Sequence, residues 1–307
     1  MMPRVRVVPV AVFLALSFGL AWLVALPLWI DPAGLAAPAA PFLLPVMMFT
    51  PTVATVVVVL ALRAPRKHRR AFLGIWPLGP LGRWLRYLGI ALVVPIAIVV
   101  AAVFLSAAFG WIDLDLAGLS GFRAQLAAAV PAGTPLPPLH LLLVLQLVQI
   151  PLGAVINSVF AAGEEIGWRG WLQPALMPLG AWQAILITGV AWGLWHSPVI
   201  LLGYNFGRTD ITGVLFMVGG CVMWGLFLGW LRLRTDSVWP AVLAHGSLNA
   251  VGGFVVLVSA AGSTVDMAVV GPLGVVSWVL LGIVMVVIVG LERMRVARSA
   301  DDTSSPG

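Results

Sequence analysis

Residues 161–170 read AAGEEIGWRG and place two adjacent glutamates, Glu164 and Glu165, and one arginine, Arg169, between long apolar segments. Only 9% of the 307 residues are charged, whereas 61% are hydrophobic and the mean hydropathy is +1.08. This composition is typical of an integral membrane protein. An ionisable side chain at membrane depth costs about 2.5–3.5 kcal/mol on insertion scales, so three of them together indicate a functional site.

Helix geometry separates the two glutamates. Glu165 and Arg169 are four residues apart and would lie on one face, whereas Glu164 is rotated from them by about 100°. We therefore predict an ion pair between Glu165 and Arg169 that leaves Glu164 free for chemistry. A purely structural ion-pair cluster that ends a helix is the alternative at this point. We expect the helix to continue through Leu176, because Trp171 to Leu176 remains largely compatible with a helix, and this places Glu164 roughly 18 Å inside it.

Eight apolar segments are long enough to cross a membrane as helices. They are residues 8–30, 42–62, 88–109, 139–162, 182–202, 211–231, 238–260 and 269–290. The first is long for the apolar part of a signal peptide, so we expect it to remain as a span. The predicted fold is an all-α, polytopic membrane protein with about eight transmembrane helices.

We expect one integral membrane domain with three parts. Residues 1–138 would form an N-terminal three-span region, 139–260 the catalytic helices, and 261–307 the last span with a disordered polar tail from Ser299. Gly225 and Gly229 form a GxxxG pattern, which is typical of close helix contacts within or between chains. The single cysteine, Cys221, lies in an apolar run and is expected to be a small buried residue.

The basic residues are distributed unevenly along this topology. Eight spans place both termini on one side, and that side carries all of the 17 Lys and Arg residues except Arg123 and Arg208. Basic residues accumulate in cytoplasmic loops, so both termini are predicted to be cytoplasmic in a protein of the cell membrane. The same distribution explains the net charge of +6 and argues against a nucleic-acid partner.

Three further polar residues lie inside apolar segments. His196 occurs in AWGLWHSPVI, one turn after Trp192, and His245 and Asn249 form an i,i+4 pair in LAHGSLNA. A lone helical histidine is often bonded to a neighbouring backbone group, and small polar faces also serve helix packing. We favour a functional site because two polar groups that point together are costly without partners.

The candidate catalytic set is therefore Glu164, His196, His245 and Asn249. A carboxylate and an imidazole can deprotonate a water, and a second imidazole with an amide can stabilise an oxyanion. Alternatively, Glu164, His196 and His245 with a water would suit a catalytic zinc ion. Both arrangements lead to hydrolysis, and the sequence does not decide between a divalent metal and none. Neither HExxH nor GxSxG occurs in the sequence.

These residues resemble a known family. Glu164, Glu165 and Arg169 match EExxxR, His245 and Asn249 match HxxxN, and the WxxxH setting of His196 is similar to FxxxH with tryptophan at the phenylalanine position. Over roughly residues 161–250 the chain resembles the CAAX-processing and bacteriocin-processing (CPBP) intramembrane proteases, which include the type II CAAX endopeptidases.

The resemblance implies an eight-helix membrane protease with a cavity open to the cytoplasm. Glu164 and His196 would activate the water and His245 and Asn249 would assist the oxyanion, with Glu165 and Arg169 in support. Family members are often called metalloproteases, but these residues leave the metal open. The departure at Trp192 is expected to affect pocket packing more than chemistry.

Three functions follow in order of preference. The first is an intramembrane endopeptidase that cleaves a membrane-associated or small peptide substrate, in CAAX-type or bacteriocin-type processing. The second is a non-proteolytic immunity or partner-binding protein on the same scaffold. The third is an ion-coupled transporter that uses the glutamates and histidines, which we rank lowest because the sequence shows neither an internal repeat nor paired broken helices. The expected partners are membrane lipid and a peptide or protein substrate.

Overall fold

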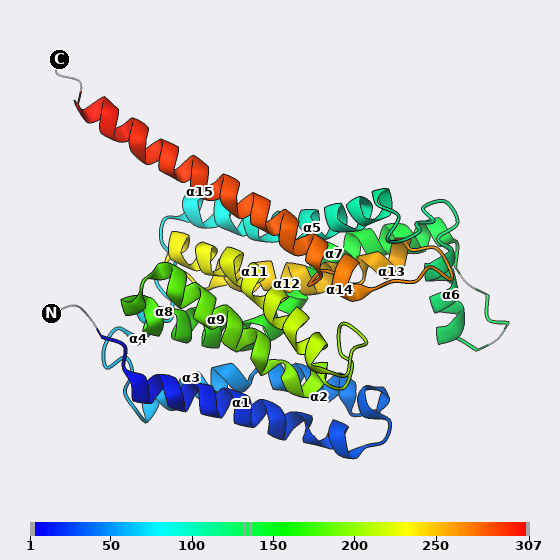
Figure 1. Cartoon of the computed structure of the whole chain (residues 1–307), viewed down its shortest axis with the longest axis horizontal. Helices are drawn as coiled ribbons and strands as arrows, with labels where there is room; N and C mark the ends of the chain where they lie inside the picture. The colour runs from blue at the N-terminus through cyan, green and yellow to red at the C-terminus, as the bar shows by residue number, and fades with distance from the viewer. Residues whose placement is uncertain (1–3, 132, 136, 305–307) are drawn as a thin grey trace.

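The structure is a computed structural model that describes residues 4–131, 133–135 and 137–304, with side chains described up to residue 290. Within these ranges the regular elements are helices, and the extended pairing consists of one isolated bridge between Leu114 and Ser259. This confirms the predicted all-α class (Figure 1). Residues 305–307 of the polar tail lie outside the described residues.

Seven helical segments in the described part of the chain are long and apolar enough to cross a membrane. They are Val7–Ile30, Ala40–Leu60, Leu81–Ala108, Leu139–Leu179, Ile211–Thr235, Trp239–Val258 and Met267–Gly290. The remaining expected span is a shorter apolar helix, α9 (Ala181–Trp195), followed by α10 (Ser197–Ile200). The chain is therefore an integral membrane protein.

Several spans are divided where proline or glycine interrupts the hydrogen-bond ladder. The N-terminal spans are α1 (Val7–Ile30), α2 (Ala40–Met48) with α3 (Thr50–Leu60), and α5 (Leu81–Ala108). The later spans are α7 (Leu139–Glu165), α11 (Ile211–Thr235), α12 (Trp239–Val251) with α13 (Phe254–Val258), and α14 (Met267–Val270) with α15 (Val275–Ser304). Short elements in the connections are η1 (Gly34–Ala36), α4 (Arg69–Phe72) and α6 (Ser120–Ala129). Since α15 continues to Ser304, the structure differs here from the disordered tail expected from Ser299.

The helix that carries the glutamates does continue as expected. After α7 the chain forms a π-helical stretch, Ile166–Leu172, then α8 (Gln173–Leu176) and the 3₁₀ turn η3 (Met177–Leu179). π-Helical turns are rare and are frequently found at functional sites. This one packs closely on α3, because a Cβ atom on Gly167 would lie 2.4 Å from Cβ of Pro51.

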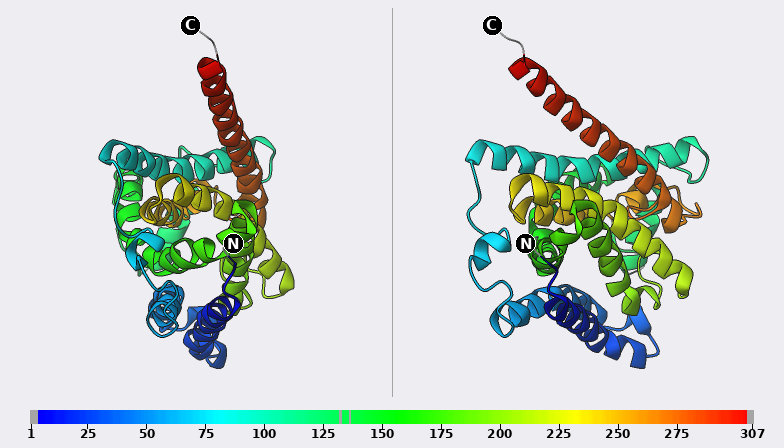
Figure 2. Two further views of the ribbon diagram at one scale, coloured as in Figure 1. Left: turned by 90° about the vertical axis from the view of Figure 1, so that its left-hand side faces the viewer. Right: turned by 60° about the vertical axis from the view of Figure 1, so that its left-hand side comes forward.

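The connections divide into two groups at opposite ends of the bundle. Both ends of the described chain lie at one end, which we call the terminal face (Figure 1). The terminal face also carries residues 61–80, 177–180 and 236–238. The opposite face carries residues 31–39, the described residues of 109–138 (109–131, 133–135 and 137–138), 201–210 and 259–274 (Figures 1 and 2).

Gly225 and Gly229, the glycines of the GxxxG pattern, lie at a close contact between two helices. A Cβ atom on Gly225 would lie 3.4 Å from Cα of Gly189, and one on Gly229 would lie 2.8 Å from the Ile185 side chain. The GxxxG pattern of α11 therefore packs against α9 within the chain. Helix α1 is also part of the fold, since the Phe13 ring lies between the Trp168 and Trp171 rings, with centroids 5.5 and 4.9 Å away.

Gly246 allows α12 to approach α7, and an alanine there should destabilise the protein by about 1–3 kcal/mol. A Cβ atom at this position would lie 2.4 Å from the Ala154 carbonyl oxygen and 2.8 Å from the Ser158 backbone nitrogen, so backbone would have to move. Thermal unfolding in detergent measures the change. Gly19→Ala in α1 is the control, because no heavy atom lies within 4 Å of its Cβ position. Equal stability of the two variants would contradict the close approach.

Candidate functional site

A buried ion pair lies beside the cavity and holds one of the histidines. Arg169 Nη1 donates to Glu165 Oε1 at 2.9 Å, and His245 Nδ1 lies 2.9 Å from the same oxygen. The side chains of Glu165 and Arg169 are 0% and 1% exposed, so the predicted i,i+4 pair is present and almost dry. A carboxylate can only accept, so Nδ1 of His245 carries the hydrogen and Nε2 is left for other partners.

Glu164 has different surroundings, although it is the next residue in α7. Its Oε2 accepts a hydrogen bond from the indole nitrogen of Trp192 at 2.6 Å. Its side chain lines a cavity that Glu165 does not reach. Helix rotation has therefore separated the two acids, one into an ion pair and the other onto a cavity wall.

Trp192 is the centre of this arrangement. Its ring centroid lies 5.9 Å from that of His196 and 5.2 Å from that of His245, and Arg169 Cζ lies 4.3 Å from the same ring. The predicted spans that contain these histidines begin at residues 182 and 238. By helix rise alone, His196 lies about 21 Å and His245 about 10 Å from the start of its own span. The large indole ring connects these two positions. The sequence predicted only a packing effect at Trp192, whereas its N–H also bonds to Glu164.

His196 lies where α9 ends. Its Nδ1 is 2.9 Å from the backbone oxygen of Trp192, and because a carbonyl only accepts, Nδ1 must donate and Nε2 is free. The helix stops here since Pro198 has no N–H to give to the carbonyl of Leu194. The hydroxyl of Ser197 bonds to that carbonyl instead.

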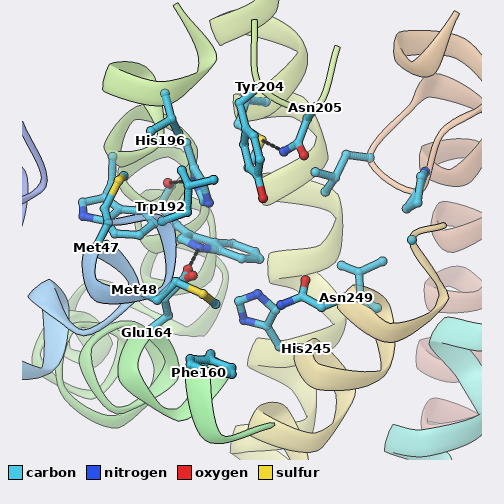
Figure 3. A pocket seen from close by; sticks show the side chains of 18 of the residues that line it. Met47, Met48, Phe160, Glu164, Trp192, His196, Tyr204, Asn205, His245 and Asn249 are labelled. Atoms are coloured by element: carbon cyan, nitrogen blue, oxygen red, sulfur yellow. Dashed lines mark hydrogen bonds between the residues drawn. The ribbon is translucent and has the colours of Figure 1, made fainter. Parts of the chain in front are cut away.

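The four candidate residues line one cavity of about 450 Å³, shown in Figure 3. Glu164 comes from α7, His196 from the end of α9, and His245 and Asn249 from α12. Asn249 is exposed, and the other three are almost fully buried. Three helices that are far apart in the sequence thus bring these side chains to the same space.

The lining also contains polar residues that sequence reasoning missed. Asn157, Tyr204 and Asn205 line the cavity. Asn157 lies seven residues before Glu164, two helical turns away on nearly the same face, and this spacing could have identified it. Tyr204 and Asn205 belong to the connection between α10 and α11, and no periodic pattern links such residues to a site. In Figure 3 the Tyr204 hydroxyl points toward His245 and Asn249.

The cavity extends toward the opposite face. Its lining includes Tyr204 and Asn205 from the connection 201–210, Met267 at the start of α14, and Leu273 between α14 and α15, all at that face. A cavity open to the cytoplasm and cytoplasmic termini were both expected. If both termini are cytoplasmic, the opposite face lies on the other side of the membrane. A cavity that is reached through the opposite face then cannot also open to the cytoplasm.

A zinc ion held by Glu164, His196 and His245 was the alternative that the sequence left open. Among the described residues no group of three or more His, Cys, Asp or Glu side chains is arranged to hold a metal. Nδ1 of His245 is bonded to Glu165, and the Trp192 indole contacts the rings of both His196 and His245. The described side chains are therefore not gathered around one point in the way that metal ligands are.

Trp192→Phe should lower the rate of any reaction that depends on Glu164, by roughly 10-fold or more. The change keeps an aromatic ring but removes the N–H, and a hydrogen bond to a charged group is worth about 1.5–3 kcal/mol. The matched control is Trp168→Phe, because the Trp168 indole nitrogen is buried without a hydrogen-bond partner among the described residues. Rate measurements on both purified variants test this role, and equal rates would contradict it.

Part of the chain that contains this site matches a known protein family. Residues 142–251 match the family model described as type II CAAX prenyl endopeptidase Rce1-like. This segment runs from the first turn of α7 to the end of α12 and contains all four candidate residues. No curated protein matches the chain. Residues 142–251 therefore form a domain of the Rce1-like family of CAAX-type intramembrane proteases.

Proposed function

We propose that the chain is an intramembrane endopeptidase in which Glu164 activates a water molecule for attack on a peptide bond. The observation that carries the proposal is the convergence of Glu164, His196, His245 and Asn249 on one cavity inside a membrane protein. The family match supports proteolysis as the reaction class. The substrate class is a membrane-associated or small peptide, in CAAX-type or bacteriocin-type processing.

The reaction begins with proton transfer to Glu164. The Glu164 carboxylate takes a proton from the water as its oxygen attacks the peptide carbonyl carbon, which gives a tetrahedral oxyanion. Nδ1 of His196 donates to the Trp192 carbonyl, which leaves Nε2 as the ring nitrogen that serves the proton transfers with Glu164. When the C–N bond breaks, the proton passes to the leaving amine, so atoms and charges balance.

The oxyanion is stabilised by Asn249 and His245. The amide of Asn249 offers N–H donors at the exposed part of the cavity wall. His245 in its protonated form donates from Nε2 while the Glu165 carboxylate holds Nδ1. Arg169 also pairs with the Glu165 carboxylate and holds it in place, which makes Glu165 and Arg169 positioning residues.

We also propose that residues 139–260 supply the catalytic helices, with residues 1–138 and 261–307 as supporting parts of one membrane domain. The proposed location is the cell membrane with both termini in the cytoplasm, on the grounds of the basic residues at the terminal face.

Four methionines, Met47, Met48, Met217 and Met267, line the cavity. Methionine side chains adapt to varied apolar partners, which suits apolar substrate residues.

The test of the proposed function compares peptide termini in membranes with the native chain and with His196→Gln. Glutamine can still donate to the Trp192 carbonyl but cannot take up a proton, so cleavage should fall by about 10²-fold or more. New termini that depend on the native chain would support proteolysis and reveal its substrate. Identical termini in both membranes, with the two proteins equally folded and abundant, would overturn it in favour of a binding scaffold.

A further inference from the structure

The two ends of the cavity are built differently. Toward the opposite face the wall is formed by connecting segments, and Tyr204 there is 37% exposed while it lines the cavity. None of the lining residues belongs to the described terminal-face connections, residues 61–80, 177–180 and 236–238. The cavity thus approaches solvent at the face that is farther from both termini.

The π-helical stretch closes the bundle on the terminal side of the cavity. Trp168, Trp171 and Leu172 are 0–1% exposed and pack against α1 and α3 in this layer. Trp171 donates to the Ala64 carbonyl oxygen at 2.7 Å, which fixes the indole to the connection after α3. Arg232 lies in the same layer and donates to the backbone oxygens of Arg169 and Phe72 at 3.2 and 2.9 Å. These bonds join three separate segments and leave little room for a peptide.

The charges place this sealed layer on the cytoplasmic side. The connection 61–80 carries five basic residues between Arg63 and Arg70 in a short stretch, whereas the connections of the opposite face carry only Arg123 and Arg208. Basic residues in short loops remain on the cytoplasmic side. Arg208 is also paired with Asp266 at 3.0 Å, so its charge is balanced locally.

We propose that the peptide reaches the active site from the extracytoplasmic side of the membrane. This inference rests on the proposed function and narrows its substrates to secreted or outward-facing membrane peptides that present an apolar segment at the outer surface. The methionines of the lining accept the apolar side chains, and Tyr204 stands at the outer wall where an incoming chain passes. A substrate confined to the cytoplasm would meet the sealed layer instead.

Cysteine labelling in intact cells tests the side of access. Cys221 is the only cysteine in the sequence and is fully buried, so the native chain should give little background. We choose Tyr204→Cys and Met267→Cys as probes of the cavity, because Asn205 has a φ of 65° that cysteine rarely adopts. Lys67→Cys is the matched probe of the terminal face, since Lys67 is exposed in the connection 61–80.

A membrane-impermeant maleimide should label Tyr204→Cys and Met267→Cys in intact cells, and Lys67→Cys only after permeabilisation. The same treatment should block peptide cleavage by whichever cavity variant retains activity, and leave cleavage by Lys67→Cys intact. Two cavity positions guard against one variant failing to fold.

The reverse labelling pattern would overturn the proposal, because it would place the cavity end in the cytoplasm. Labelling from outside without any block of cleavage would also overturn it, since the peptide would then use another path. A native chain that cleaves nothing would defeat the proposed function instead, and the labelling pattern would still decide the side on which the cavity opens.

Discussion

Glu164→Gln should lower the rate of peptide hydrolysis by roughly 10²–10⁴-fold, the usual contribution of a general base. Glutamine keeps the size of the side chain, and its amide oxygen can still accept the hydrogen bond that Trp192 donates to Glu164 in the native protein. It cannot take a proton from water at neutral pH. The loss should therefore lie in the chemical step, with binding of the peptide retained.

Folding of this variant should not suffer. Glu164 is 2% exposed, and a neutral amide costs less to bury than a carboxylate. The free energy of unfolding should therefore stay the same or increase. Cleavage rates and thermal unfolding measured on the same purified sample separate the two effects. Native activity in a folded Glu164→Gln protein would remove this carboxylate from the mechanism.

Arg169→Met should destabilise the protein by about 3–5 kcal/mol, the usual cost of removing one partner of a buried ion pair. Of the two ion-pair partners of Glu165, only His245 would remain. The charged Glu165 side chain is 0% exposed, so water could not replace Arg169. Arg169 also contacts the Trp192 ring, so that packing would be lost as well. Denaturant titration in detergent micelles measures the change.

The double variant Glu165→Gln/Arg169→Met provides the control for this pair. It removes both charges, so much of the stability lost in Arg169→Met should return. Activity should not return with it, because His245 would no longer be held by a carboxylate. A double variant as unstable as Arg169→Met would show that packing, and not the unpaired charge, causes the loss.

The sequence predicted the parts of this site that depend on one helix. The ion pair of Glu165 with Arg169 follows from four-residue spacing, and the spans follow from apolar runs of sufficient length. Partners on different helices could not be predicted in this way. His245 bonds to Glu165 and not to Glu164 because of how α12 packs on α7, and spacing within α12 carries no information on that choice.

Segments with irregular backbone could not be predicted from the sequence either. The π-helical stretch Ile166–Leu172 packs closely against α3, and hydropathy does not distinguish it from an α-helix. Tyr204 lies in a connection, where neither helical nor alternating periodicity applies. The predicted cytoplasmic opening of the cavity came from a family resemblance, and the end of the bundle that the cavity reaches depends on these same connections.

The tryptophan-rich layer at Trp168 and Trp171 has a consequence for the membrane as a barrier. A hydrolase at this depth must admit water, and a continuous file of water across the bundle would carry protons between the two compartments. Because the rings and the Arg232 hydrogen bonds fill the bundle on the terminal side of the cavity, we expect water to reach Glu164 from the opposite face alone. The cell could then maintain many copies of this protein without dissipating its proton gradient.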